Sequence, residues 1–266
     1  MPFLTLDRVS HYYFSPTNYT KALEDISFSV TEGEFISIIG PSGCGKSTIL
    51  SIVARIMEQT EGQIYIQDQE LMHSSVQIGY MLQQDYLFPW KTIIDNILLG
   101  PKINENITDK TISDAKKLLQ DVHLSGTEDQ YPTELSGGMR QRVALIRTLI
   151  TNPDILLFDE PFSALDYVTK LKLENIVAEM VKRYKKTTIL VTHDLGEAIS
   201  MSDRIILMDA KPGRVSKVFE VPEAIRHVEP FYVRRHEAYQ PLFDHIWQHV
   251  SDDMGVERNN EHEGNN

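Results

Sequence analysis

A glycine-rich segment that carries a lysine and three hydroxyl residues is the part of this sequence best suited to chemistry. Residues 40–48 read Gly-Pro-Ser-Gly-Cys-Gly-Lys-Ser-Thr and fit the pattern G-x-x-x-x-G-K-[ST] in full. Glycines let successive backbone N–H groups point at phosphate oxygens. Lys46 would reach the β- and γ-phosphates of a nucleotide, and Ser47 would bind Mg²⁺. The residues expected to contact the nucleotide here are Gly40, Pro41, Ser42, Gly43, Cys44, Gly45, Lys46, Ser47 and Thr48.

Two adjacent carboxylates follow an apolar stretch later in the chain. Residues 155–158 read Ile-Leu-Leu-Phe, and Asp159 and Glu160 come directly after them. A buried strand delivers such side chains to its carboxyl end, the edge at which α/β sheets bind ligands. Two acids in this position usually mark a solvated strand end, but a complete phosphate-binding loop favours a functional reading. We expect Asp159 to hold Mg²⁺, directly or through water, and Glu160 to polarise the water that attacks the γ-phosphate.

A second helix start with accessible backbone N–H groups lies at residues 135–141, which read Leu-Ser-Gly-Gly-Met-Arg-Gln. Ser136 is a typical N-cap, and Gly137 and Gly138 leave the backbone open to an anion. Ordinary helix capping alone would produce part of this pattern. With Gln141 included, the stretch resembles the signature motif of the ATP-binding subunits of ATP-binding cassette (ABC) transporters. The resemblance extends over residues 3–220.

The resemblance implies catalytic roles for residues that mean little singly. Gln83 is similar to the family's glutamine that touches Mg²⁺ and the attacking water. The stretch from Ser163 to Asp166 resembles the family's D-loop, and Asp166 is therefore expected near the nucleotide. His193 resembles the switch histidine that contacts the γ-phosphate, and it is expected to be catalytic together with Glu160 and Gln83. These elements occur in the order that the family shows.

The resemblance also implies how ATP is enclosed. Tyr13 is similar to the aromatic residue that stacks on adenine, and Tyr12 is a close alternative. In the family two such chains pair head to tail. Each ATP then lies between the phosphate-binding loop and acidic pair of one chain and Ser136 to Gly138 of the other. The sequence therefore predicts a homodimer with two composite sites.

The hydrophobic pattern predicts an α/β fold. Strand-like and helix-like segments alternate in the later part of the chain, which favours a parallel core. The residues at 31–34 read as a hairpin turn between two strands. Strands are expected at 3–9, 26–30, 35–39, 62–66, 76–82, 155–158, 188–191 and 205–208, and helices at 46–57, 111–122, 136–150, 167–184 and 195–201.

The domain organisation combines this pattern with the resemblance. The family's fold is a P-loop NTPase core with an N-terminal antiparallel β subdomain and an inserted helical subdomain. We expect residues 1–220 to form this nucleotide-binding domain, with the helical insertion at about 85–151. Residues 221–250 are expected to form a short helical extension. Residues 251–266 are acidic and polar and are expected to be a disordered tail.

Composition restricts the classes of function. The chain has 266 residues, a net charge of −12 and a pI near 5.2, which argues against a nucleic-acid partner. The single cysteine, Cys44, allows no intrachain disulfide, and we interpret it as a small loop residue rather than a redox centre. His245 and His249 lie four residues apart without an evident third ligand and are expected to face solvent.

The sequence also bears on the membrane. No apolar run reaches the roughly 20 residues that span a bilayer, and the N-terminus does not read as a signal peptide. If the protein works at a membrane, another chain must therefore do the spanning. The resemblance supplies such chains, because it implies transmembrane permease subunits, an indirect solute-binding partner and a peripheral location on the cytoplasmic face.

The residues after Gln83 favour one direction of transport. Residues 87–90 read Leu-Phe-Pro-Trp, which is similar to importer ATPases for nitrate, sulfonates and taurine. The short C-terminal segment leaves no room for the larger regulatory domain of sugar-importer ATPases. Two alternatives stay open at this point, an exporter ATPase subunit and, with less support, a non-transport ABC ATPase. Trp90 itself could line a docking groove or simply pack on the helical insertion.

Overall fold

The computed structural model describes residues 2–253, and the first strands of the chain form an antiparallel sheet with the order β2-β1-β4-β5. Its strands are β1 (Leu4–Phe14), β2 (Tyr19–Val30), β4 (Glu61–Ile66) and β5 (Gln69–Glu70). β1 runs five residues beyond the strand expected at 3–9, because β2 pairs with it as far as Phe14 opposite Tyr19. Both side chains are exposed there, so burial periodicity gave no signal for this half of the hairpin.

The second sheet supplies the parallel core, with the order β10-β9-β3-β8-β7-β6. All neighbouring strands are parallel except the pair of β10 and β9. The carboxyl ends of β3, β6, β7 and β8 therefore meet at one edge of the sheet, where ligands bind in such folds. The strands are β3 (Phe35–Ile39), β6 (Ile78–Met81), β7 (Ile155–Asp159), β8 (Thr187–Val191), β9 (Arg204–Asp209) and β10 (Arg214–Glu220).

The turn at 31–34 joins the two sheets, so its prediction as a hairpin turn was wrong. β2 belongs to the antiparallel sheet, whereas β3 lies in the parallel one. The Arg204 side chain donates to the Glu34 carboxylate at 2.8 Å and fastens this turn to β9. Alternating hydrophobicity identifies a strand, but it does not say which strand lies beside it.

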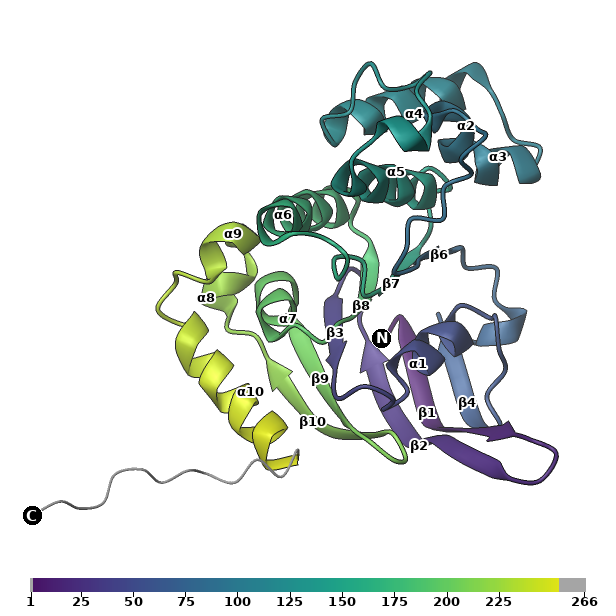
Figure 1. Ribbon diagram of the computed structural model, residues 1–266. Helices are drawn as coiled ribbons and strands as arrows, with labels where there is room; N and C mark the ends of the chain where they lie inside the picture. The colour runs from purple at the N-terminus through teal and green to yellow at the C-terminus, as the bar shows by residue number, and fades with distance from the viewer. Residues whose placement is uncertain (1, 254–266) are drawn as a thin grey trace, which may run out of the picture.

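Helices surround the parallel sheet and form a lobe at one end of the molecule (Figure 1). In that lobe α2, α3 and α4 lie beyond α5, while α1 lies between the two sheets. The segment between β6 and β7 contains helices and turns without a strand. The helices are α1 (Lys46–Val53), α2 (Ile93–Ile97), α3 (Leu99–Ile103), α4 (Asp109–Asp121), α5 (Gly137–Leu149), α6 (Tyr167–Tyr184), α7 (Leu195–Met201), α8 (Glu223–Arg226), α9 (Pro230–Val233) and α10 (Tyr239–Asp253).

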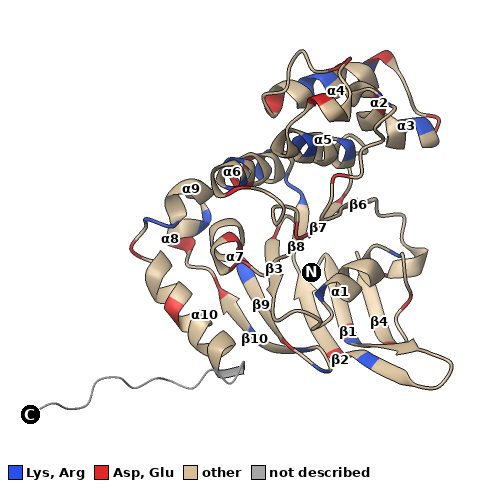
Figure 2. Cartoon of the chain, viewed as in Figure 1, with Lys and Arg blue, Asp and Glu red and all other residues tan. Residues whose placement is uncertain are grey.

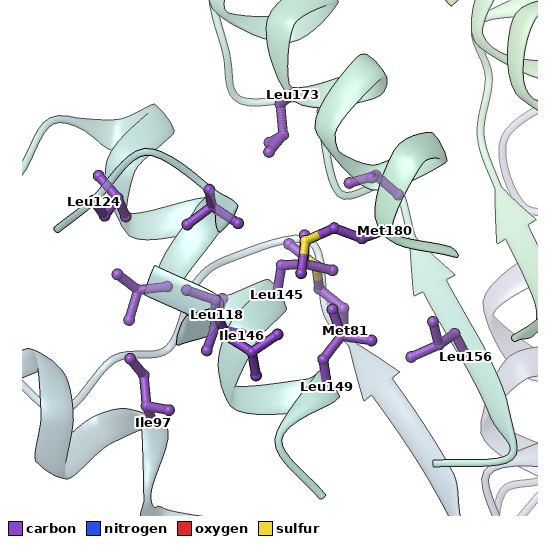
Figure 3. Packing of buried hydrophobic residues seen from close by; sticks show 14 of the residues in the cluster. Met81, Ile97, Leu118, Leu124, Leu145, Ile146, Leu149, Leu156, Leu173 and Met180 are labelled. Carbon is purple, nitrogen blue, oxygen red and sulfur yellow. The ribbon is translucent and has the colours of Figure 1, made fainter. Parts of the chain in front are cut away.

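One continuous core ties the helical lobe to the sheet. Figure 3 shows Ile97 and Leu118 of the lobe packing near Leu145 of α5, with Leu156 of β7 on the other side. Leu145 and Leu156 are fully buried. Burying each such leucine side chain stabilises the fold by about 1.5–3 kcal/mol. α5 therefore belongs to both parts, and a movement of the lobe would carry the N-terminus of α5 with it.

A second core holds α1 against both sheets. Ile49 and Leu50 of α1 pack in one cluster with Ile38 of β3, Val191 of β8 and Ile64 of β4. All five side chains are at most 1% exposed. The N-terminus of α1 is consequently held in a fixed place at the edge where the parallel strands end.

The segment expected to form a short helical extension, residues 221–250, holds three helices. β10 pairs with β9, and α8, α9 and α10 follow it and cover this end of the sheet (Figure 1). Their apolar side chains form a third cluster in which Ile246 of α10 contacts the group around Phe219 and Val233. The tail predicted for 251–266 overlaps α10 as far as Asp253 and otherwise lies outside the described residues.

Two smaller expectations can be compared with the described part of the chain. His249 contacts the ammonium group of Lys217 at 2.6 Å, and its ring stands edge-on to Phe219, so it is not simply solvated. Residues 2–253 contain no cluster of three His, Cys, Asp or Glu side chains suited to a metal ion. Among the same residues, no helix is both long and apolar enough to cross a membrane.

Candidate functional site

The phosphate-binding loop joins the end of β3 to the start of α1, at the edge where the parallel strands end. Gly43 and Gly45 have φ values of 80° and 92°, which disfavour residues with a Cβ atom. A Cβ atom on Gly40 would lie 2.6 Å from the carbonyl oxygen of Met208. The glycines are therefore required by the path of the backbone as well as by access to a ligand.

Lys46 lies folded over this loop. Its Nζ atom donates to the carbonyl oxygens of Gly40 at 2.8 Å and Pro41 at 3.0 Å. The side chain thus crosses the concave face of the loop rather than pointing into solvent. Cys44 is fully buried, and burial raises the pKa of its thiol. A protonated, inaccessible thiol is unreactive, which agrees with a role as a small loop residue.

The Asp159 carboxylate meets the loop at the end of β7. Ser47 Oγ donates to Asp159 Oδ1 at 3.0 Å, and Tyr80 Oη donates to Oδ2 at 3.2 Å. Burial raises the pKa of Asp159 despite these two hydrogen bonds. Burial also raises the pKa of Tyr80 to about 12, so this hydroxyl stays protonated and keeps its role as a donor. A desolvated carboxylate beside a serine hydroxyl is a pair of oxygen ligands that a cation would stabilise.

Glu160 lies next to His193 at the same edge. Glu160 Oε2 and His193 Nδ1 are 3.1 Å apart. Glu160 has a φ of 47°, in the left-handed region that non-glycine residues rarely adopt. Its backbone is fixed in that conformation by a hydrogen bond from its N–H to the carbonyl of Val191 at 2.9 Å. A residue with such a constrained backbone is suited to hold its side chain in one fixed direction.

Gln83 is connected to Glu160 through Ser163. Gln83 Nε2 donates to Ser163 Oγ at 3.0 Å, and that hydroxyl donates to the Glu160 carbonyl at 3.0 Å. The Gln83 carbonyl in turn accepts from Gln141 of α5 at 3.0 Å. The predicted glutamine, the acidic pair and the predicted D-loop are therefore brought together at one place.

Sequence reasoning missed the residues that anchor the segment after Gln83. Arg140 pairs with the Asp85 carboxylate at 2.9 Å. Arg147 donates to the backbone carbonyls of Asp85 at 2.6 Å and Tyr86 at 2.8 Å. Both arginines lie on α5, about two helical turns apart on one side. The sequence indicated these two arginines only weakly, as cations on the face of α5 that borders its apolar residues.

The two tyrosine candidates for adenine stacking lie on opposite faces of β1. Tyr13 Oη is 3.2 Å from Thr48 Oγ1 and donates to Met57 Sδ at 3.6 Å, so its ring lies beside the loop and α1. Tyr12 instead stacks with Phe14 at 6.3 Å between ring centroids. The geometry favours Tyr13, whose side chain is 44% exposed and accessible to a ligand.

The signature residues lie apart from the phosphate-binding loop within this chain. Ser136 caps α5 by accepting from the Met139 N–H, and Gly138 lies against Thr169, where a Cβ atom would be 2.3 Å from Cγ2. Asp166 caps α6 in the same way, and the hydrogen bond from Thr169 lowers its pKa. Figure 1 shows the start of α5 beside α6, with the central strands between it and α1.

Trp90 is exposed rather than packed on the helical insertion. Its side chain is 71% exposed, and its ring lies 5.2 Å from that of Phe88. This exposure disfavours the interpretation that Trp90 simply packs on the helical insertion. An exposed tryptophan next to the segment anchored by Arg140 and Arg147 leaves the docking interpretation in place.

The chain is similar in sequence to known proteins over most of its length. The model of the ABC transporter family matches residues 23–163. The uncharacterized ABC transporter ATP-binding protein YtlC of Bacillus subtilis is 50% identical over 97% of this chain and 100% of its own length. The aliphatic sulfonates import ATP-binding protein SsuB of Bacillus cereus is 42% identical over 82% of this chain and 85% of its own.

Solved structures give the same picture. The dimeric structure of the ATP-binding cassette MJ0796 bound to ADP and Pi superposes with a TM-score of 0.72 at 31% identity. The similarity covers 82% of this chain and 99% of that one.

Proposed function

This chain belongs to the ABC transporter family and hydrolyses ATP to ADP and phosphate to drive transport, and from that premise we propose that it energises an importer of aliphatic sulfonates or closely related small oxyanions. The observation that carries the substrate class is the 42% identity to a protein named for aliphatic sulfonate import, over 82% of this chain. The stretch from Leu87 to Trp90 supports the same branch, since it is similar to importers of nitrate, sulfonates and taurine.

The proposed division of labour follows the contacts at the strand ends. Tyr13 stacks on adenine, and the loop from Gly40 to Thr48 encloses the phosphates with its backbone N–H groups. Lys46 leaves the loop carbonyls to contact the β- and γ-phosphates. Glu160 accepts a proton from the attacking water, while His193 and Gln83 hold the γ-phosphate and that water in line.

The residues present suit Mg²⁺ beside the nucleotide. The Ser47 hydroxyl and the half-buried Asp159 carboxylate lie 3.0 Å apart, and we propose the Gln83 amide oxygen as a further ligand. Magnesium prefers such oxygen ligands and would neutralise charge on the β- and γ-phosphates. Burial raises the pKa of Asp159 because it disfavours the charged form, and a bound cation would favour that form again.

Two copies of the chain are proposed to enclose two ATP molecules. Ser136, Gly137 and Gly138 of one copy would face the γ-phosphate held by the other, with Asp166 at the same interface. The solved relative MJ0796 is dimeric. Closure of this dimer would be transmitted to transmembrane permease subunits on the cytoplasmic face, which receive solute from a binding protein.

Reconstitution tests the substrate class. The chain is purified with its permease subunits, placed in proteoliposomes and mixed with the solute-binding protein of the same transporter. We expect ethanesulfonate, taken up with the binding protein, to stimulate ATP hydrolysis and to accumulate on the side opposite the binding protein. Nitrate and taurine are compared at the same concentration. Net movement of the solute toward the binding-protein side would contradict import and favour an exporter.

Trp90→Ala tests the docking interpretation. Because Trp90 is 71% exposed, its removal should leave the melting temperature and the basal ATPase rate of the isolated chain nearly unchanged. Assembly with the permease should weaken, and transport should be lost. Trp247→Ala is the matched control, since this tryptophan on α10 is also exposed, at 52%. A large fall in melting temperature with loss of basal activity would show that Trp90 is structural.

A further inference from the structure

An ionic network involves the residues that flank and follow His193. The backbone segment that carries His193 is fixed by its two neighbours. Asp194 Oδ1 accepts from the Glu197 N–H at 3.1 Å and caps α7, and Thr192 Oγ1 accepts from the Asp194 N–H at 3.0 Å. The Thr192 hydroxyl also donates to the Glu197 carboxylate. The position of His193 therefore depends on where Asp194 and Glu197 are held.

Lys170 holds both carboxylates. Its Nζ atom lies 2.5 Å from Asp194 Oδ2 and 2.5 Å from Glu197 Oε1. Lys170 is one turn beyond Asp166 on α6, and its side chain is only 14% exposed. These pairs raise the pKa of Lys170 although burial alone would lower it. A single ammonium group thus ties the His193 segment to the start of α6.

A competing carboxylate lies one turn further along α6. Glu174 is four residues after Lys170, the spacing at which oppositely charged helical residues pair. Its side chain is completely buried, and burial raises its pKa. A buried carboxylate without a partner is costly, so Glu174 would attract the nearest free cation. Lys170, one turn earlier on the same helix, is a cation that could pair with it.

Arg234, from the C-terminal segment, pairs with the Glu174 carboxylate. Its Nη1 and Nη2 atoms donate to the two carboxylate oxygens at 2.9 Å and 3.1 Å, a two-point contact that an ammonium group cannot make. α9 delivers this arginine, because the Phe231 N–H donates to Asn175 Oδ1 on α6 at 2.9 Å and Val233 is fully buried. Charges of both signs gather where α6, α7 and this segment meet (Figure 2).

Arg234 also lies close to α7. A Cβ atom on Gly196 would lie 3.0 Å from Asp194 Oδ1 and 3.3 Å from Arg234 Nε. The arginine, the cap of α7 and the backbone of Gly196 therefore share one small space. The C-terminal segment therefore lies against α7, the helix that begins directly after His193.

We propose that Arg234 is a positioning residue for His193: by pairing with Glu174, it leaves Lys170 committed to Asp194 and Glu197. This rests on the proposed role of His193 in ATP hydrolysis. Without Arg234, the Glu174 carboxylate draws Lys170 away, and the segment from Thr192 to Asp194 loses its anchor. The C-terminal segment thereby sets the rate of hydrolysis without touching the nucleotide.

The test uses the full chain and measures kcat and KM for ATP well below the melting temperature. Arg234→Met should lower kcat by about ten- to a hundredfold, because a displacement of about 1 Å at a reacting group has an effect of this size. KM for ATP should change by less than about twofold, since nucleotide binding is not involved. Arg226→Met is the control, because this arginine of the same segment pairs with the largely exposed Glu220. It should leave kcat unchanged.

A second substitution separates positioning from simple loss of stability. Glu174→Gln removes the competing charge, so kcat should return toward the wild-type value in the Glu174→Gln/Arg234→Met double variant. Lys170→Met should also lower kcat, and Glu174→Gln should not rescue it. A merely structural role predicts a lower melting temperature with unchanged kcat per folded chain, and that result would overturn the proposal.

His193→Ala distinguishes the proposal from the assignment beneath it. If Arg234 acts through His193, adding Arg234→Met to His193→Ala should lower kcat no further. Additive losses would overturn the positioning role while leaving the role of His193 intact. If His193→Ala alone retained the wild-type rate, the assignment of His193 in hydrolysis would fail instead.

Discussion

Replacing Glu160 by glutamine should lower the turnover of ATP by about 10²-fold or more, the range in which positioned general bases contribute. Glutamine keeps the shape of the side chain but cannot accept a proton from the attacking water. It can still bond with His193 Nδ1, 3.1 Å away in the wild type. ATP binding should survive, because Lys46, Ser47 and Tyr13 are untouched, and an ATP-bound dimer should accumulate.

The measurement is single-turnover hydrolysis together with sedimentation in the presence of ATP and Mg²⁺. Glu179→Gln is the matched control, because Glu179 on α6 is 66% exposed and pairs with Arg183 on the same helix. Its rate should equal that of the wild type. Near-normal hydrolysis by Glu160→Gln would contradict the assignment of Glu160 as the group that polarises water.

The sequence predicted the site well wherever chemistry is confined to a short stretch. The loop at 40–48, the acids at 159–160 and the helix starts at 136 and 166 are each local patterns, and they lie at the ends of strands or helices as expected. α6 and α7 have the predicted bounds because their apolar periodicity continues from one end to the other. The pairing of loop and acids across the sheet follows from parallel strands ending at one edge.

Other features depend on contacts between distant residues, which no local pattern reports. Tyr80 bonds with Asp159 across 79 positions, and Arg234 bonds with Glu174 across 60. β10 was missed because its side chains alternate between exposed and half-buried, with Phe219 alone fully in the core. The hairpin turn at 31–34 was wrong for a related reason, since strand periodicity carries no information about the partner strand.

The same distinction explains why two halves of the proposed site are far apart in one chain. Ser136 and Gly138 are positioned by α5 and its contact with Thr169 of α6, whereas Lys46 and Asp159 are positioned by the sheet. Within the described residues, no hydrogen bond or ion pair joins 136–138 to 40–48. A helix start that presents backbone N–H groups without an anion of its own chain is suited to a phosphate held by a second copy.

Replacing Ser136 by arginine is therefore expected to stop hydrolysis without stopping binding. A bulky cation at this helix start would obstruct the approach of the partner's γ-phosphate and deny it the backbone N–H groups that stabilise charge there. Loss of such donors typically lowers turnover by about 10²–10³-fold. ATP affinity of the isolated chain should stay close to the wild-type value, because Lys46 and Tyr13 are intact, while ATP-dependent dimerisation should fall.

Loss of the helix cap must be separated from loss of the interface, because Ser136 accepts from the Met139 N–H and its removal costs about 1 kcal/mol of stability. Thr108→Arg removes the equivalent cap from α4, which lies in the lobe beyond α5, and so reproduces that cost away from the signature motif. It should keep wild-type turnover. The decisive measurement is the rate per chain against protein concentration. For a composite site the wild-type rate must rise with concentration as dimers form. A rate that stays constant down to concentrations at which the chain is monomeric would show that one copy holds a complete site.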